Sequence, residues 1–128
     1  MTYFPQPTPS KRATRIKLDG SVLVAIRREG ARSVRAKLHE VSATGGLLIL
    51  AEPLGEGDFV QVAFQTSKGA VHGMAEILTP RVKSNRGCLQ PFRFVALDDE
   101  AHNNLCMALQ TLADQTTVGI SSSRALSL

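Results

Sequence analysis

The chain has 128 residues, of which 43% are hydrophobic and 20% are charged, and this length and composition fit one globular domain with a single modest core. The formal net charge of +4 is a mild basic excess that does not by itself indicate nucleic-acid binding. No apolar run approaches the roughly 20 residues of a membrane helix, and none follows the first methionine as in a signal peptide, so we expect a cytoplasmic protein without membrane insertion.

The first segments in chain order are an arm and a hairpin. Residues 1–9 contain three prolines at alternating positions, which favours a flexible, extended and unpaired arm. A first strand is expected to begin at Ile16. Apolar residues then alternate with other residues over 22–26 and over 34–38, which predicts two strands joined by a turn at 29–30.

The same period of two continues through the middle of the chain. Strands are predicted at 46–50, 60–65, 70–78 and 88–97 because apolar and polar residues alternate there or because the run is short and apolar. Glycine-containing turns separate these strands, and the polar stretch at 80–87 is typical of a loop. This pattern indicates an antiparallel β-domain.

The period changes to that of a helix after the last strand. Three acidic residues at 98–100 place negative charge where a helix amino terminus favours it, and apolar residues recur at helical spacing as far as Ala113. Residues 116–128 are expected to be a disordered tail, so the domain should cover 10–115. The sequence therefore predicts a mainly β fold, a small six-stranded antiparallel β-barrel with a C-terminal α-helix.

Residues with catalytic or metal-binding potential do not form a recognisable site in the sequence. His39, His72 and His102 are too far apart for a local metal motif, and Ser42 lacks the preceding glycine of a nucleophile elbow. The two cysteines have no partner at metal-ligand spacing and are interpreted as reduced apolar residues. We therefore expect that the protein is not an enzyme and that it has neither a metal site nor a cofactor.

Positive charge is gathered before and within the first hairpin. Residues 11–37 hold nine basic side chains and two acidic ones, a net charge of +7, while the rest of the chain has a net charge of −3. Lys11, Arg12 and Arg15 precede the first strand, where the arm can carry their side chains over the barrel. Guanidinium groups bind phosphate oxygens in pairs and stack on base rings, so this cluster suits an anionic, planar ligand. The arginines of the hairpin itself are expected to be solvated.

A polar turn at residues 40–46 is the second candidate for ligand binding. A period of two places Glu40 and Ser42 on the same face. The Glu40 carboxylate can accept from the N–H groups of guanine, and Gly45 allows the backbone to come close to a ligand. The alternative is an ordinary strand-connecting turn in which Ser42 caps backbone amides.

Together the two motifs resemble those of the PilZ domain family, and the resemblance covers about residues 10–113. Family members have an Arg-x-x-x-Arg segment leading into the first strand and an Asp/Asn-x-Ser-x-x-Gly turn after it. These motifs grip cyclic di-GMP, a bacterial second messenger, on the outside of a six-stranded split barrel. Arg15 matches the second arginine, and Lys11 stands at the position of the first, unless Arg12 takes that place in a loop shorter by one residue.

The second family motif matches with one change. Ser42 and Gly45 agree with the family pattern, and Glu40 stands where the family has Asp or Asn. The ligand-binding residues that the resemblance implies are Lys11, Arg12, Arg15, Glu40, Ser42 and Gly45.

The leading functional hypothesis is a cyclic di-GMP receptor that signals by ligand-induced ordering of its arm and altered binding of a protein partner. The alternative is a degenerate PilZ-like adaptor that binds protein partners without nucleotide. Binding of RNA or single-stranded DNA is disfavoured, because residues 11–37 contain no aromatic side chain for base stacking.

Overall fold

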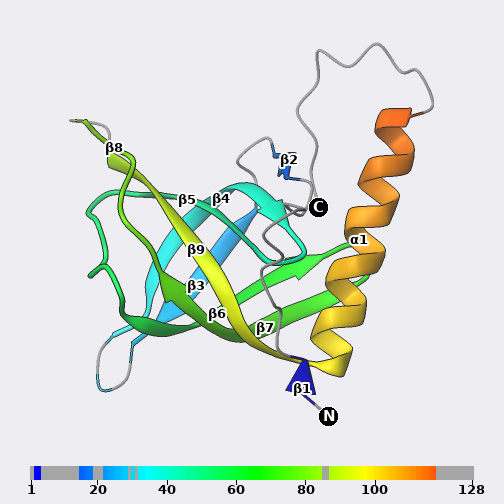
Figure 1. Cartoon of the computed structure of the whole chain (residues 1–128), viewed down its shortest axis with the longest axis horizontal. Helices are drawn as coiled ribbons and strands as arrows, with labels where there is room; N and C mark the ends of the chain where they lie inside the picture. The colour runs from blue at the N-terminus through cyan, green and yellow to red at the C-terminus, as the bar shows by residue number, and fades with distance from the viewer. Residues whose placement is uncertain are drawn as a thin grey trace, which may run out of the picture.

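The computed structural model describes residues 2–3, 15–18, 22–28, 30, 32–84 and 87–117. These residues form nine strands and one helix (Figure 1), which are in chain order β1 (Thr2–Tyr3), β2 (Ile16–Lys17), β3 (Leu23–Arg27), β4 (Val34–Ser42), β5 (Gly45–Leu50), β6 (Phe59–Thr66), β7 (Gly69–Ile77), β8 (Val82–Ser84), β9 (Gly87–Asp98) and α1 (Asp99–Thr117). Within this part of the chain, no helix has both the length and the hydrophobicity that a membrane span requires.

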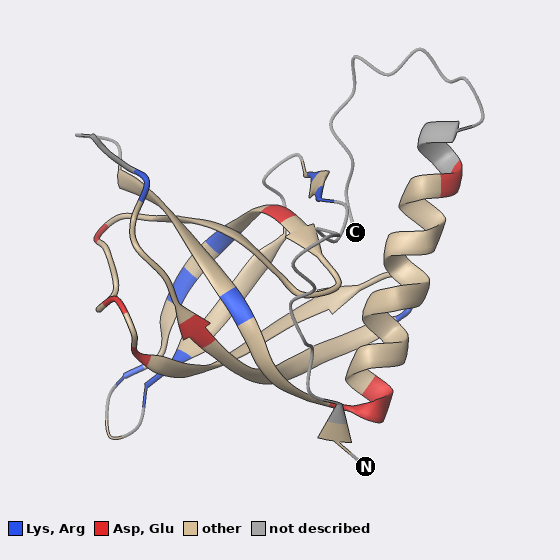
Figure 2. Cartoon of the chain, in the orientation of Figure 1, with Lys and Arg blue, Asp and Glu red and all other residues tan. Residues whose placement is uncertain are grey.

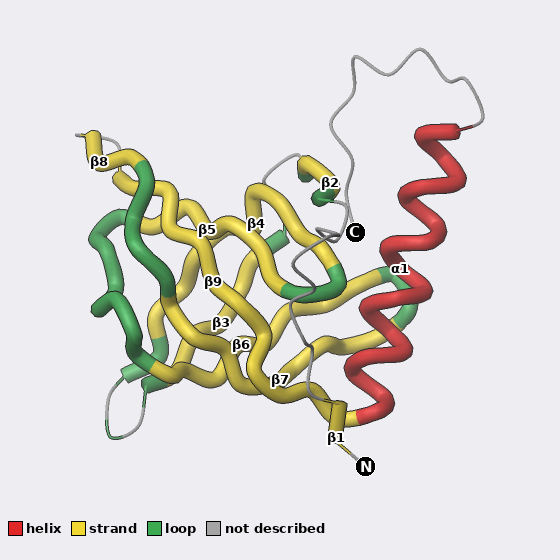
Figure 3. Tube along the Cα trace, in the orientation of Figure 1, coloured by secondary structure: helices red, strands yellow, loops and turns green. Residues whose placement is uncertain are grey.

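Six of the strands close into an antiparallel barrel (Figure 3). Neighbouring strands pair in the order β9–β5–β4–β3–β6–β7, and β7 pairs with β9 to complete the circle. β9 can pair on both sides because its 12 residues meet β5 through the first half and β7 through the second. Of the short strands, β1 and β8 pair with β9, and β2 pairs with β4. The predicted six-stranded antiparallel barrel is confirmed.

The barrel interior is filled by inward-pointing side chains, which alternate with exposed ones along the strands. In β3 and β6, exposed and buried residues alternate strictly, as expected when one face of a strand meets the core and the other meets water. Phe92 and Phe94 of β9 are both buried, and their rings lie edge to face with centroids 5.2 Å apart. Phe64 of β6 packs 6.5 Å from Phe94. These aromatic rings connect β6 and β9 through the core.

The helix α1 begins where the acidic residues predict a helix start. The Asp98 carboxylate accepts a hydrogen bond from the Ala101 N–H at 2.6 Å, which is the geometry of an N-cap. Asp99 and Glu100 occupy the first turn, where negative charge is stabilised by the helix dipole. Figure 1 shows the helix along one side of the barrel, next to β7. Its buried face consists of Ala101, Leu105, Ala108 and Leu112.

Three elements differ from the expectation. Thr2–Tyr3 pairs with β9, so the prediction of an unpaired arm is wrong at these two residues, which precede the first proline and keep their backbone donors. Val82–Ser84 pairs with β9 where a loop was expected, because an edge hairpin is held by backbone groups and needs no apolar face. The helix runs to Thr117 and so includes the first residues of the predicted disordered tail, since no glycine or proline ends it earlier. The remaining residues of the predicted arm and tail lie outside the described part of the chain.

Candidate functional site

Strand β2 places Arg15 beside the polar turn. β2 runs antiparallel to β4, with Ile16 opposite Val41. Arg15 directly precedes Ile16, so the same register brings it next to Ser42, the last residue of β4. The Arg15 side chain is exposed. Two segments that are distant in the sequence therefore meet at the end of β4.

A β-bulge carries β4 beyond its predicted end. The register with β5 shifts between Leu38 and Glu40, so His39 is the extra residue and the alternation of inward and outward side chains changes there. Val41 then points into the core, where it is fully buried. Glu40 and Ser42 share the opposite side of the strand, as their spacing predicts. The residues expected in a turn thus belong to a strand, and the turn itself is only 43–44.

The Ser42 hydroxyl closes this turn. It accepts a hydrogen bond from the Thr44 N–H at 3.2 Å and donates to the Gly45 carbonyl at 3.3 Å. The hydroxyl of Thr44 lies 3.3 Å from it, and Ser42 is only 3% exposed. The capping role that the sequence left open as an alternative is therefore observed.

Two glycines let β5 lie close to its neighbours. A Cβ atom on Gly45 would stand 2.2 Å from the Phe92 carbonyl oxygen, and one on Gly46 would stand 2.5 Å from the Glu40 carbonyl oxygen. Neither glycine has a positive φ, so the requirement is space and not backbone conformation. What approaches Gly45 in this fold is the backbone of β9.

A second arginine lies on the same side of the barrel as the turn. Cross-strand register aligns Ser42, Gly45 and Arg93 in one row across β4, β5 and β9. The guanidinium of Arg93 forms an ion pair with Glu76 of β7. Sequence reasoning did not select Arg93, although it lies between two inward-pointing phenylalanines and must therefore face outward.

The next row of the same face carries charges of both signs. Lys17 of β2 stands opposite Glu40, and opposite charges at such a cross-strand position attract each other. Figure 2 shows basic segments on β2 and β9 and acidic segments on β4 and β7 around this face. With Arg15 and Arg93, the face offers three cations together with the Glu40 carboxylate.

Four of the six predicted ligand-binding residues therefore lie on one face, which we call the ligand face and define by strands β2, β4, β5 and β9. Its chemistry combines guanidinium groups with a carboxylate acceptor beside a tight turn. The four residues that meet there are Arg15, Glu40, Ser42 and Gly45. The other two predicted residues, Lys11 and Arg12, lie outside the described residues.

Comparison with solved structures identifies the fold. No protein-family model and no curated protein matches the sequence. YcgR from Escherichia coli, solved in complex with c-di-GMP, matches with a TM-score of 0.71 at 19% identity over 89% of this chain and 50% of YcgR. The separate PilZ domain of the same protein, also solved with c-di-GMP, matches with a TM-score of 0.58 at 16% identity over 86% of this chain and 98% of that domain. The chain folds as a PilZ-like domain.

The structure of a second protein agrees with this assignment. MrkH from K. pneumoniae in its apo state matches the PilZ-like domain with a TM-score of 0.65 at 9% identity, over 89% of this chain and 55% of MrkH. The chain thus spans about half the length of the full YcgR and MrkH chains. The fold implied by the two sequence motifs is confirmed.

The described part of the PilZ-like domain has no group of three His, Cys, Asp or Glu residues that could hold a metal ion. On α1, Cys106 and His102 lie one turn apart, with Sγ 3.4 Å from Nε2. Burial raises the pKa of the Cys106 thiol, so the thiolate that metals and electrophiles require is disfavoured.

Proposed function

We propose that this PilZ-like domain is a cyclic di-GMP receptor module. The observation that carries the proposal is the meeting of Arg15 with the turn at 42–45 on one outer face of the barrel, although they come from motifs far apart in the sequence. YcgR, which has the same fold, is solved in complex with c-di-GMP. The two motifs and the fold together support the same ligand for this chain.

The groups on the ligand face match the chemistry of the ligand. Cyclic di-GMP carries two phosphate charges and two guanine bases, so its site needs cations, planar groups and a hydrogen-bond acceptor. Arg15 would bind a phosphate with two parallel hydrogen bonds. Arg93 offers a second guanidinium plane on the same row, and Glu40 would accept from the N–H groups of guanine. Lys11 and Arg12 add positive charge from the preceding segment.

Signalling would follow from the position of Arg15 between the paired strand β2 and the preceding segment. A ligand held by Arg15 and the turn attracts Lys11 and Arg12 onto the barrel. The ordered segment then changes the surface that the domain offers to a protein partner, which is a ligand-driven ordering step.

Calorimetric titration of the full chain with cyclic di-GMP tests the receptor function, and we expect saturable binding. Each charge-assisted hydrogen bond contributes about 1.5–3 kcal/mol, so Arg15→Ala should weaken binding by about tenfold or more. Arg81→Ala, which removes an exposed arginine between β7 and β8, should bind like the wild type. Absence of heat at tens of micromolar ligand would contradict the proposal.

Limited proteolysis tests the ordering step separately. Bound cyclic di-GMP should slow tryptic cleavage after Lys11 and Arg12 several-fold, because an ordered segment fits a protease less readily. Cleavage after the exposed Lys68 in the β6–β7 turn serves as the internal control and should not change. An unchanged rate at Lys11 and Arg12 with ligand bound would reject the ordering step but leave the receptor function intact.

One observation favours the adaptor as a second candidate. The Ser42 hydroxyl is already engaged in the turn and is hardly exposed, so it has little capacity left for a ligand. A domain that lost nucleotide binding could keep this serine for its fold alone. The same titration separates the two functions, because the adaptor gives no heat with cyclic di-GMP.

A further inference from the structure

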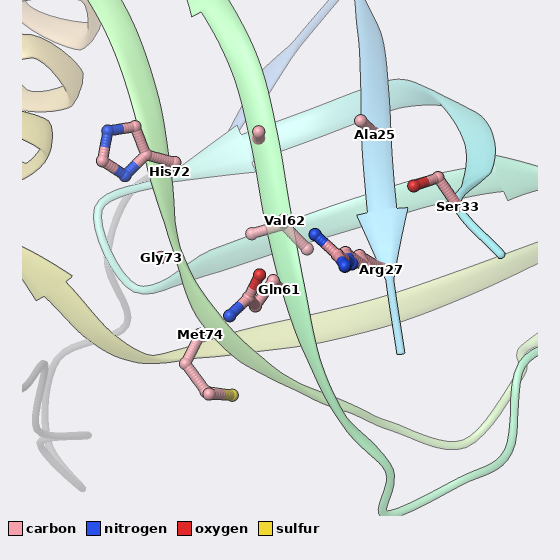
Figure 4. A pocket seen from close by; sticks show the side chains of 9 residues that line it. Ala25, Arg27, Ser33, Gln61, Val62, His72, Gly73 and Met74 are labelled. Carbon is pink, nitrogen blue, oxygen red and sulfur yellow. The ribbon is translucent and has the colours of Figure 1, made fainter. Parts of the chain in front are cut away.

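A groove lies on the outer face of β3, β6 and β7 (Figure 4). Cross-strand register places Arg27, Gln61 and Met74 in one row across these strands. Two adjoining depressions of about 440 and 460 Å³ share these three residues in their walls. In the circular strand order, two strands separate β6 from β5 in either direction. The groove and the ligand face therefore lie on opposite sides of the barrel.

The groove combines an apolar floor with exposed apolar side chains. Ala25, Ala63 and Gly73 line the floor. Phe59 is 58% exposed and Met74 is 36% exposed, and both line the second depression. Large apolar groups in water are unfavourable, and burial against a partner removes this cost.

Positive charge lines the β3 side of the groove. Arg27 and Arg28 line it directly. Among the described residues, the acidic group that pairs with them is Asp58, which lies 3.4 Å from Arg28 in a solvent-exposed pair of little net strength. Three more exposed cations continue along the β3–β4 hairpin: Arg32, Arg35 and Lys37. The charge of the groove therefore complements an acidic partner.

The side chains that line the groove favour a peptide over a nucleic acid as its ligand. Among the described groove residues, Phe59 is the aromatic one, whereas strands of nucleic acid stack successive bases on several aromatic faces. A floor of alanine and glycine next to the flexible Met74 side chain fits an aliphatic or aromatic side chain of a peptide.

We propose that this groove binds an acidic segment of a partner protein. An apolar side chain of that segment is seated between Phe59 and Met74, and flanking carboxylates pair with Arg27 and Arg28. The inference goes beyond the proposed function, because it assigns a separate partner-binding surface on the side of the barrel opposite the ligand face, and it does not require that the domain bind nucleotide.

Amide chemical-shift mapping on the full chain tests the groove with defined peptides. The probe is a synthetic peptide in which two leucines are flanked by glutamates, and we expect saturable shifts confined to β3, β6 and β7. Two control peptides replace the leucines with serines or the glutamates with lysines, and both should bind at least about tenfold more weakly. Repeating the titration with cyclic di-GMP already present shows whether the ligand face affects the groove. The groove proposal requires only that the peptide binds, with or without cyclic di-GMP.

Matched variants identify the responsible side chains. Phe59→Ala and Arg27→Glu should each weaken peptide binding by about tenfold. Met107→Ala removes a similarly exposed apolar side chain from α1, and Arg81→Glu reverses an exposed charge between β7 and β8. Both controls should bind the peptide like the wild type. Phe59→Ala and Met107→Ala should leave the cyclic di-GMP affinity unchanged, and Arg27→Glu and Arg81→Glu should lower it equally, because both change the net charge by the same amount.

Three results would overturn the groove proposal. The first is the absence of saturable shifts with the acidic peptide, and the second is an equal response to the lysine peptide. The third is a different occupant: tighter binding of single-stranded DNA, or a concentration-dependent dimer in sedimentation that Phe59→Ala abolishes. Failure of the cyclic di-GMP titration alone would reject the receptor function and leave the groove untouched.

Discussion

Ser42 belongs to a ligand-binding motif in the sequence, but in the structure its side chain stabilises the fold. Its hydroxyl bonds within the turn to Thr44 and Gly45, which fixes the direction in which β5 leaves β4. A ligand on this face therefore meets the exposed Arg15 and the Glu40 carboxylate more directly than the hydroxyl. Under the proposed function, Ser42 would contribute to binding by shaping the turn beside these two charges.

Gly45→Ala should destabilise the domain by about 1–3 kcal/mol, because the added methyl group overlaps the Phe92 carbonyl oxygen and the strands must move apart. Urea unfolding measures the change. The control Ala63→Ser alters an exposed position on β6 and should stay within about 0.5 kcal/mol of the wild type. A Gly45→Ala protein of full stability with weakened cyclic di-GMP binding would show that ligand contact, and not strand packing, requires this glycine.

Among the elements, the end of the barrel near β8 depends on one buried polar side chain. Gln90 of β9 is fully buried. Its side-chain oxygen accepts from the Leu54 N–H at 2.7 Å, and its amide nitrogen donates to the carbonyls of Leu54 and Leu78 at 2.8 and 3.1 Å. Gln90 thus holds the β5–β6 connection and the segment after β7 to the barrel wall.

Gln90→Leu should lower the free energy of unfolding by about 2–4 kcal/mol, because backbone groups of Leu54 and Leu78 lose their partners while the volume is nearly kept. Chemical denaturation gives the size of the loss. Gln90→Glu keeps an acceptor for the Leu54 N–H but loses both donated bonds, so it should also be less stable than the wild type. Wild-type stability in Gln90→Leu would mean that water replaces all three bonds.

The elements also show which parts of the fold local patterns can predict. β3, β6 and β7 were predictable because one face of each strand meets the core, so apolar residues recur at every second position of the sequence. β4 was predicted too short, because the bulge at His39 breaks that period and makes 40–42 look like a turn. β8 has only three residues and pairs with β9, and so short a strand shows no period of two in the sequence.

The candidate site was likewise predictable only in part from the sequence. Arg15, Glu40, Ser42 and Gly45 were found from the spacing of their motifs. Arg93 was missed because its place beside Gly45 depends on the pairing of β5 with β9, and cross-strand register is not contained in any local pattern. The groove was missed for the same reason, since its cations and its aromatic residue come from different strands.

For the whole molecule, the basic excess of residues 11–37 predicts a strong effect of salt on ligand binding. The Debye length falls from about 10 Å at 0.1 M salt to about 3 Å at 1 M, so the dissociation constant for the dianionic cyclic di-GMP should rise several-fold over this range. Calorimetry at a series of sodium chloride concentrations measures the slope. Arg15→Ala should reduce that slope, and an affinity independent of salt would contradict an electrostatic role for the ligand face.

The two short strands β1 and β2 have a consequence for the cations that precede the barrel. β1 pairs with β9 and β2 pairs with β4, so the described residues on both sides of the interval 4–14 pair with strands of the barrel. Four residues span at most about 14 Å, and Lys11 therefore stays within that distance of Arg15 in every conformation. Under the proposed function, a nucleotide bound at the turn would therefore meet the charges of Lys11 and Arg12 at the high effective concentration of intramolecular groups.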